Sequence, residues 1–228
     1  MEEKRHTSAE YERELQEIKE GLLYLGALTE KALERGSVAL LERNSELARQ
    51  IVCDDDVIDR LDVEIEEKCI RLLALRQPAA RDLRFITTAI KITGHLERIG
   101  DMAAKIAEKV IILNELPSIK PYIDLPRMGE IVRGMIHKSL DALVSENVKL
   151  AQKVREEDTV IDQLNDQIFR ELLTYMSEDL KTISRATRLL FITKYLERMA
   201  DHAVNIAELV IFLVEGKIVR HLKYPEKR

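Results

Sequence analysis

Hydrophobic residues recur at steps of three and four along most of this chain, with polar residues between them. The clearest run consists of Phe85, Ala89, Ile92, Leu96, Ile99, Ala103, Ile106, Val110 and Leu113. Because an α-helix completes a turn about every 3.6 residues, this spacing places the whole run on one buried face. A second run of the same kind consists of Leu196, Met199, Ala203, Ile206, Val210 and Leu213. The pattern predicts long amphipathic helices that pack by one face.

The two hydrophobic runs belong to an internal repeat. The segment LERIGDMAAKIAEKVIIL (96–113) aligns without a gap with LERMADHAVNIAELVIFL (196–213), at an offset of 100 residues. Upstream, DVIDRLDVEI (56–65) aligns with TVIDQLNDQI (159–168), at an offset of 103 residues. Insertions are accommodated in loops, so the change of offset predicts a turn between these segments in each half.

The repeat and the periodicity together predict an all-α fold, a tandem repeat of two three-helix bundles with six long helices. The turns indicated by the change of offset lie near Pro78 in the first half and near 177–179 in the second. The expected helices are 8–50, with a kink near Gly36 or Asn44, then 54–76, 80–113, 126–154, 157–176 and 178–215.

The join between the halves is marked by proline. The segment NELPSIKPYIDLP (114–126) holds three of the five prolines in the chain, and proline removes a helical hydrogen bond and clashes with the preceding turn. We therefore expect a first bundle at 1–115, a linker at 116–125 and a second bundle at 126–228.

Composition narrows the class of protein. Hydrophobic residues make up 46% of the chain and charged residues 34%, with only 8 glycines and no tryptophan, which favours long helices over many short strands. A formal net charge of -5 argues against a nucleic-acid partner, which needs a basic face. No apolar run approaches the roughly 18 residues of a membrane span. Cys53 and Cys69 form no CxxC pair, so we expect reduced thiols and a cytoplasmic protein.

Acidic pairs with the spacing acid-x-x-x-acid occur at repeat-matched positions, and each pair lies on one face of its helix. The first acidic cluster is Asp55, Asp59, Glu97 and Asp101; the second acidic cluster is Asp158, Asp162, Glu197 and Asp201. If the two helices of each hairpin are antiparallel, their spacing from the predicted turn brings each set of four to the same height. On the third helix of each half the acids lie opposite the buried run, so we expect them on the outer surface.

Stacked carboxylates cost a helix a few tenths of a kcal/mol per pair, and their repetition indicates a bound cation. Ligands that are all oxygen suit hard cations such as Mg²⁺, Ca²⁺, Mn²⁺ or iron. The alternative is a solvated acidic face neutralised by arginines, for which Arg98 and Arg198 are placed. Further candidate ligands are Glu108, Asn205 and Glu208, whereas His202 is expected to be a surface residue.

The segments LERIGDMAAKIAE and LERMADHAVNIAE, with DDDVID and EDTVID ahead of them, resemble the paired signatures of the PhoU family from about Tyr11 to Leu213. The resemblance implies surface clusters of iron, or of zinc, held by the eight acids of the two acidic clusters. It also implies a negative regulator of phosphate uptake and the phosphate-starvation response. Its implied partners are the ATPase subunit of the phosphate ABC transporter and a sensor histidine kinase, with a homodimer left open. Gly94 and His95 become Lys194 and Tyr195 in the second half, so the two sites are expected to differ.

Two other functions remain as alternatives. One is a carboxylate-bridged di-iron enzyme, but ferritin-like sites use Glu-x-x-His pairs that point into the bundle, whereas the acidic pairs here are expected to point outward. The other is a helical adaptor that binds partners without metal. No pairing of a nucleophile with a base and no phosphate-binding loop is apparent, so we predict a protein without enzymatic activity.

Overall fold

The structure is a computed structural model that describes residues 2–119 and 122–219. Helices occupy nearly all of this length: α1 (Glu2–Leu41), α2 (Ser45–Arg76), α3 (Ala80–Asn114), α4 (Asp124–Ser145), α5 (Val148–Glu178) and α6 (Ile183–Glu215), with a short 3₁₀-helix, η1 (Leu180–Thr182), before α6. Within the described residues there is no β-strand. The predicted all-α fold of six long helices in two repeats is confirmed.

The first break in each half comes earlier than predicted. α1 ends at Leu41 rather than near residue 50, and α4 ends at Ser145 rather than near residue 154. The second helix of each half therefore begins nine residues upstream of its expected start, at Ser45 in place of 54 and at Val148 in place of 157. The predicted bounds were wrong because hydrophobic periodicity continues through both turns.

Asparagine caps explain why the chain breaks at these points. The Asn44 side chain accepts a hydrogen bond from the Leu47 amide at 2.9 Å, and the Asn147 side chain accepts one from the Leu150 amide at 3.1 Å. Such caps satisfy an amide that the first helical turn leaves without a partner. The two asparagines stand at the same offset of 103 residues as the upstream repeat segments, so this signal was present in the sequence.

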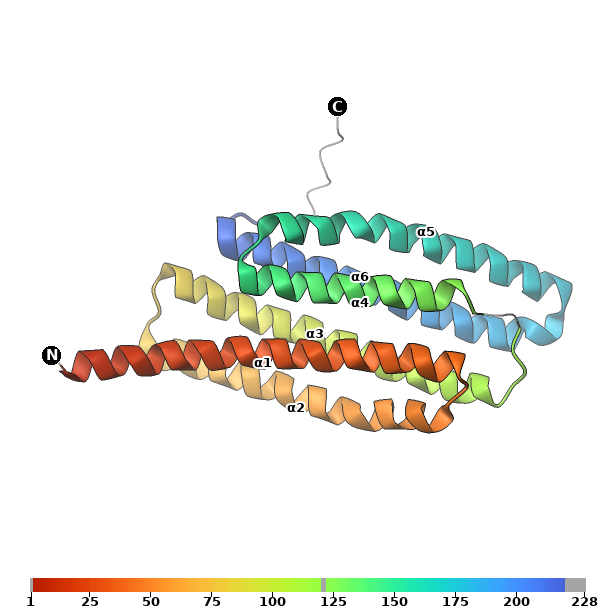
Figure 1. The fold of residues 1–228 in the computed structure, drawn as a ribbon, viewed down its shortest axis with the longest axis horizontal. Helices are drawn as coiled ribbons and strands as arrows, with labels where there is room; N and C mark the ends of the chain where they lie inside the picture. The colour runs from red at the N-terminus through yellow and green to blue at the C-terminus, as the bar shows by residue number, and fades with distance from the viewer. Residues whose placement is uncertain (1, 120–121, 220–228) are drawn as a thin grey trace, which may run out of the picture.

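Each half forms a bundle of three antiparallel helices, and the two bundles lie side by side along their length (Figure 1). α3 packs against α6 and α1 packs against α4, whereas α2 and α5 contact only helices of their own half. Buried side chains from both halves form one continuous hydrophobic core. The domain bounds proposed from the sequence stay a prediction, and of them residues 1, 120–121 and 220–228 lie outside the described part of the chain.

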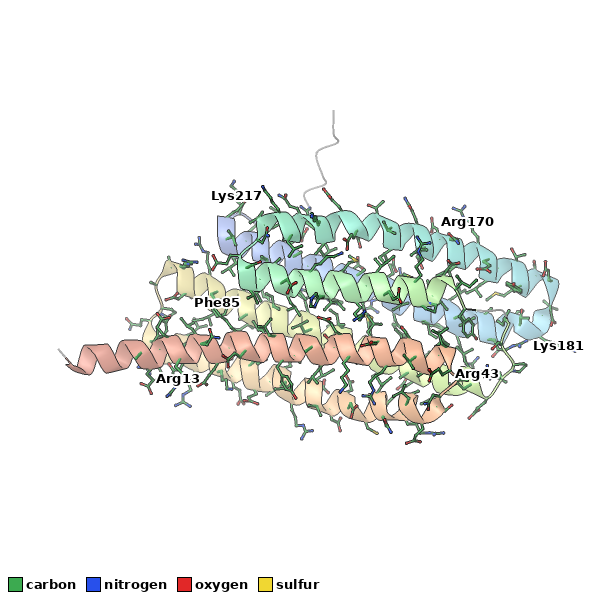
Figure 2. All side chains as sticks on the ribbon, in the orientation of Figure 1. Arg13, Arg43, Phe85, Arg170, Lys181 and Lys217 are labelled. Carbon is green, nitrogen blue, oxygen red and sulfur yellow. The ribbon has the colours of Figure 1, made fainter. Side chains whose placement is uncertain are left out.

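Arginines hold the segment that joins the bundles. Arg43 has a left-handed backbone (φ 55°) at the end of α1, and its guanidinium donates to the carbonyls of Asn114 and Leu116, both at 2.6 Å. Figure 2 shows Arg43 at this end of α1, beside the connecting segment. From the other half, Arg185 donates to the Pro117 carbonyl at 2.6 Å. Since a linker carbonyl otherwise faces water, these contacts fix the path between the halves.

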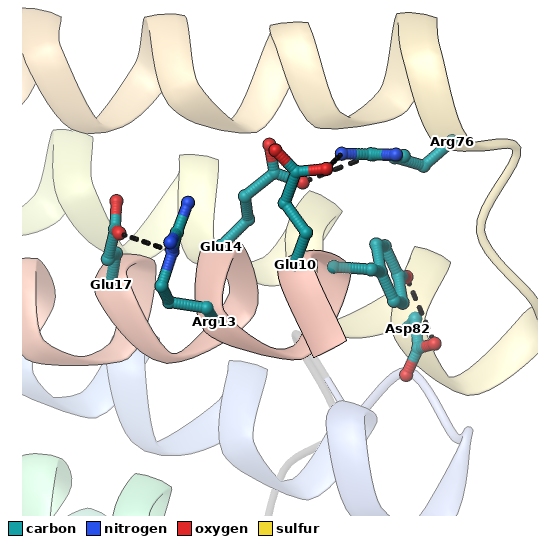
Figure 3. Close-up of polar contacts among 7 residues, drawn as sticks. Glu10, Arg13, Glu14, Glu17, Arg76 and Asp82 are labelled. Carbon is teal, nitrogen blue, oxygen red and sulfur yellow. Dashed lines mark hydrogen bonds and ion pairs between the residues drawn. The ribbon is translucent and has the colours of Figure 1, made fainter. Parts of the chain in front are cut away.

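Polar contacts join the N-terminal part of α1 to the end of α2 and the start of α3. Arg76, at the end of α2, donates to Glu10 at 2.8 Å and to Glu14 at 3.2 Å (Figure 3). The Tyr11 hydroxyl donates to Asp82 of α3 at 3.0 Å. Burial, and then the Asp82 carboxylate, raise the pKa of Tyr11 to about 12. These contacts hold α1 in place against α2 and α3.

The contact between α1 and α4 depends on small residues. A Cβ at Gly26 would lie 2.1 Å from Leu140 Cδ1, and a Cβ at Gly129 would lie 2.9 Å from Ser37 Oγ. A real Cβ cannot approach another atom so closely, so the missing side chains allow the two bundles to meet at this distance.

We predict that Gly26→Ala destabilises the protein, by about 1–3 kcal/mol, because Leu140 must leave its position in a packed core. The matched control is Gly134→Ala, since nothing lies within 4 Å of a Cβ at Gly134. That change should stabilise α4 by about 0.5–1 kcal/mol through helix propensity. Urea unfolding of the three proteins measures both effects, and equal gains for the two variants would contradict the close contact.

Candidate metal centres

The first acidic cluster lies where α2 faces α3, and each helix supplies two carboxylates. The turn at 77–79 joins the helices as an antiparallel pair. Burial raises the pKa of Asp55 to about 6, and the negative charges of Asp59, Asp101 and Glu97 add to the rise. Electrostatic coupling of this kind acts over a few ångströms. The four carboxylates predicted to converge therefore lie within electrostatic range of one another.

The second acidic cluster repeats this arrangement between α5 and α6. Burial raises the pKa of Asp158 to about 6, followed by the charges of Asp162, Asp201 and Glu197. The turn here is formed by Asp179, whose side chain accepts from the Lys181 amide at 2.9 Å, and by η1. Although this turn differs from the first, the four acids again influence one another's charge.

Of the eight acids, Asp59, Asp162 and Asp201 are exposed, as expected, whereas the other five are half-buried. The side chains of Glu97, Asp101 and Glu197 are only 23%, 28% and 18% exposed. Partial burial removes solvent from around these carboxylates, so their charges interact more strongly than charges at an exposed surface would.

The first acidic cluster has features that fit a cation. Asp55 Oδ1 is buried and has no hydrogen-bond partner, and a buried carboxylate oxygen without a partner costs free energy. A Cβ at Gly100 would lie 2.9 Å from Ile58 and 3.3 Å from this oxygen, so glycine allows α3 to approach α2 beside Asp55. All four ligand side chains offer oxygen, which suits a hard cation such as Mg²⁺, Mn²⁺ or iron.

Lysines lie against both clusters. Lys105 pairs with Asp101 at 2.6 Å, and Lys194 pairs with Glu197. Among the described residues, no group of three or more His, Cys, Asp or Glu side chains is drawn together closely enough to hold a metal ion. Metal binding at either cluster would therefore require carboxylates to turn from the positions that the structure shows.

Two of the further candidate ligands, Glu108 and Glu208, lie at a distance from the clusters. Glu108 is 53% exposed and faces Lys109 at 3.8 Å. Glu208 pairs with Arg155 at 3.4 Å and borders, with Asn205, a separate cavity of about 160 Å³. Glu108 and Glu208 each stand seven residues beyond the last aspartate of their cluster, roughly 10 Å along the helix at 1.5 Å per residue.

Two ion pairs beside the acidic clusters were not predicted from the sequence. Arg35 of α1 pairs with Asp54 at 2.5 Å, and Lys138 of α4 pairs with Glu157 at 2.5 Å. Both acids directly precede the first aspartate of a cluster, and both bases lie 103 residues apart. The repeat offset, extended to the first helix of each half, was the signal that could have found them.

Histidines meet between the two halves. His95 Nδ1 of α3 lies 2.9 Å from His202 Nδ1 of α6, and the two rings are tilted against each other. Burial, and then the nearby Arg198 and Arg98, lower the pKa of His202. His202, expected on the surface, is in fact half-buried at the contact between the bundles.

Six helices in two repeats, each with carboxylates converging between its second and third helices, define a class: a tandem three-helix-bundle protein with an acidic cluster in each half. The PhoU domain family matches residues 22–110 and 125–210. The chain belongs to the PhoU family. This confirms the predicted resemblance, and the two matched segments correspond to the two repeats.

Members of this family are similar to the chain over nearly its whole length. The phosphate-specific transport system accessory protein PhoU homolog of Aquifex aeolicus is 45% identical, over 94% of this chain and 97% of its own length. The PhoU crystal structure from Pseudomonas aeruginosa has a TM-score of 0.88 and 41% identity, covering 91% of this chain and all of the other. The phosphate transport system regulatory protein PhoU from Streptococcus pneumoniae has a TM-score of 0.85 and 31% identity, covering 92% and 99%.

The family settles the general role of the protein. PhoU proteins are accessory and regulatory proteins of phosphate transport and are not enzymes, which confirms the prediction of a protein without enzymatic activity. The carboxylate-bridged di-iron enzyme is thereby set aside. No helix in the described ranges is long and apolar enough to cross a membrane.

We predict that the acidic clusters make the metal-free protein less stable as pH rises from about 4 to about 7. Asp55 and Asp158 have folded-state pKa values near 6 against an ordinary 3.8, so the folded state favours their protonated forms. That advantage is fully present below about pH 4 and is lost as pH rises through 6. Both groups are partly exposed, so the effect should be about 1 kcal/mol per site.

Urea unfolding in the presence of a chelator measures this effect. The Asp55→Asn, Asp158→Asn variant should match the wild type near pH 4 and exceed its stability at pH 7. Asp166→Asn, at an exposed position of α5, is the control and should show no such divergence. Parallel pH profiles for the wild type and the double variant would contradict the raised pKa values.

Proposed function

We propose that this protein is a cytoplasmic negative regulator of phosphate uptake and of the phosphate-starvation response. It acts by binding the ATPase subunit of the phosphate ABC transporter and a sensor histidine kinase, with metal bound at the two acidic clusters. The observation that supports the metal part is that in each half four carboxylates lie within electrostatic range of one another, with the pKa of Asp55 and that of Asp158 both raised to about 6. The relatives' names as transport accessory proteins support the regulatory part.

Metal ions at the acidic clusters would neutralise carboxylates that otherwise repel one another. We propose iron clusters as the occupants, with zinc, manganese, magnesium or calcium as alternatives, because all of the donors are carboxylate oxygens. The residues that would hold the metal are Asp55, Asp59, Glu97 and Asp101 in the first half and Asp158, Asp162, Glu197 and Asp201 in the second. The bound cation would change the charge of the faces formed by α2 with α3 and by α5 with α6.

Protein partners, rather than nucleic acid, fit the surface. The net charge of -5 disfavours binding to phosphate backbones. Long helices offer extended faces for helical or loop partners, and the charge on the acidic faces would select partners of complementary potential. Partners would also bring the protein to the membrane, and a homodimer is a further assembly that we propose to test by light scattering.

A metal-independent helical adaptor is the second candidate. Lys105 and Lys194 already provide cations to the two acidic clusters, which favours this reading of the site. Metal analysis of the purified protein separates the two candidates, because the adaptor would bind the same partners with no metal present.

We predict that Asp59→Ala with Asp101→Ala abolishes metal binding at the first acidic cluster and leaves the second loaded. The fold should survive because neither side chain is part of the hydrophobic core. Asp162→Ala with Asp201→Ala is the reciprocal variant and should lose only the second site. Metal content per chain, measured by mass spectrometry after gel filtration, would argue against the assignment if it were unchanged in both variants.

We predict that deletion of the gene leaves phosphate-responsive genes expressed at high phosphate. Variants that remove both acidic clusters should weaken repression, or weaken capture of the transporter ATPase and the kinase in pull-down experiments. Lys217→Ala, an exposed change remote from both clusters, is the control. Normal repression in the deletion strain would contradict the proposed regulatory function.

A further inference from the structure

The two acidic clusters are not equivalent in charge. Lys194 lies one turn before Glu197 and two turns before Asp201 on the same face of α6, and its ammonium forms an ion pair with Glu197 Oε2. The matching position of the first half is Gly94, where a Cβ would meet nothing within 4 Å. The first acidic cluster therefore has open space where the second has a cation.

The influence of Lys194 extends to a second carboxylate. Burial and Glu197 raise the pKa of Asp201, whereas Lys194 opposes that rise. In the first acidic cluster the nearby ammonium is that of Lys105, which approaches Asp101 from the following turn of α3 at 2.6 Å. Position 205, which matches Lys105, is an asparagine. Each cluster thus has a lysine near it. Lys194 acts on both acids of its own helix, Glu197 and Asp201, whereas Lys105 is paired with Asp101.

We propose that Lys194 is a built-in competitor for the cation of the second acidic cluster, so that the first cluster fills at a lower metal concentration than the second. This inference rests on the proposed metal binding and adds an order of loading to it. A divalent cation that enters between Glu197 and Asp201 must displace the ammonium or remain close to it, and two positive charges at that distance repel. We expect roughly tenfold weaker binding at the second cluster, which corresponds to a modest residual repulsion in a half-exposed site.

The difference would give the protein a response in two steps. At low metal concentration only the face formed by α2 and α3 would lose its negative charge. At higher concentration the ammonium of Lys194 would be displaced, and the face formed by α5 and α6 would change as well. One residue would then set the interval between the two steps.

The experiment isolates each cluster and exchanges the residue at the matched position. Asp158→Asn with Asp162→Asn leaves only the first acidic cluster, and Asp55→Asn with Asp59→Asn leaves only the second. Mn²⁺ is the probe because it prefers oxygen ligands and because the free ion is counted directly by electron paramagnetic resonance. Helical circular dichroism and the urea midpoint check that every variant is folded.

With only the second cluster present, Lys194→Ala should strengthen Mn²⁺ binding roughly tenfold, whereas Lys194→Arg, which keeps the charge, should not. With only the first cluster present, Gly94→Lys should weaken binding by a similar factor, and Gly94→Ala should leave it unchanged. Because nothing lies within 4 Å of a Cβ at Gly94, the substitutions there test the proposal independently of any packing change at Lys194.

Equal affinity in the two backgrounds, with no response to either exchange, would overturn the order of loading and leave metal binding intact. Absence of Mn²⁺ binding in both backgrounds would overturn this inference together with the metal part of the proposed function.

Discussion

The register between the second and third helices of each half determines both the packing of the core and the position of the acidic clusters. The same antiparallel alignment that buries Ile58 and Ile99 in the core brings Asp55 and Asp59 beside the acids of α3. Short turns fix that register, and the packing of α3 on α6 extends it across the two halves. A shift of one residue would rotate every side chain by about 100° and would disrupt the core and the acidic cluster together. The site is therefore determined by the packing, and the packing is stable enough to hold like charges close together.

Repulsion within the clusters is balanced partly by cations that the chain supplies. Arg35 and Lys138 pair with the acids that precede each cluster, and Lys105 and Lys194 pair with acids inside them. These partners leave Asp55 Oδ1 buried without a hydrogen bond. They also leave raised pKa values at Asp55, Glu97, Asp158 and Asp201. A site in this condition gains most from an added cation, because the cation relieves several repulsions at once.

Hydrophobic periodicity and the internal repeat were enough to predict the number of long helices and their order in two halves. The run that ends at Leu113 predicted α3 closely. The run that ends at Leu213 predicted where α6 ends, but α6 begins at Ile183 rather than near residue 178, because η1 precedes it. The change of offset located the turns near Pro78 and Asp179. Periodicity could not locate the ends of α1 and α4, because the turn at Asn44 interrupts the chain for only a few residues. The convergence of the acids was predictable from the repeat, but their partial burial and their lysine partners were not, since these depend on side-chain packing between helices that the sequence does not order in space.

In each half, four carboxylates lie within electrostatic range of one another, where a bound cation would relieve their repulsion. Carbon-13 nuclear magnetic resonance of the aspartate side chains, followed through a pH titration of the metal-free protein, measures the pKa of each group directly. We expect Asp55 and Asp158 to titrate near pH 6, against an ordinary value of 3.8, and we expect saturating Mg²⁺ to move both titrations down in pH. Titration of both residues near pH 4, with no response to the cation, would contradict this expectation.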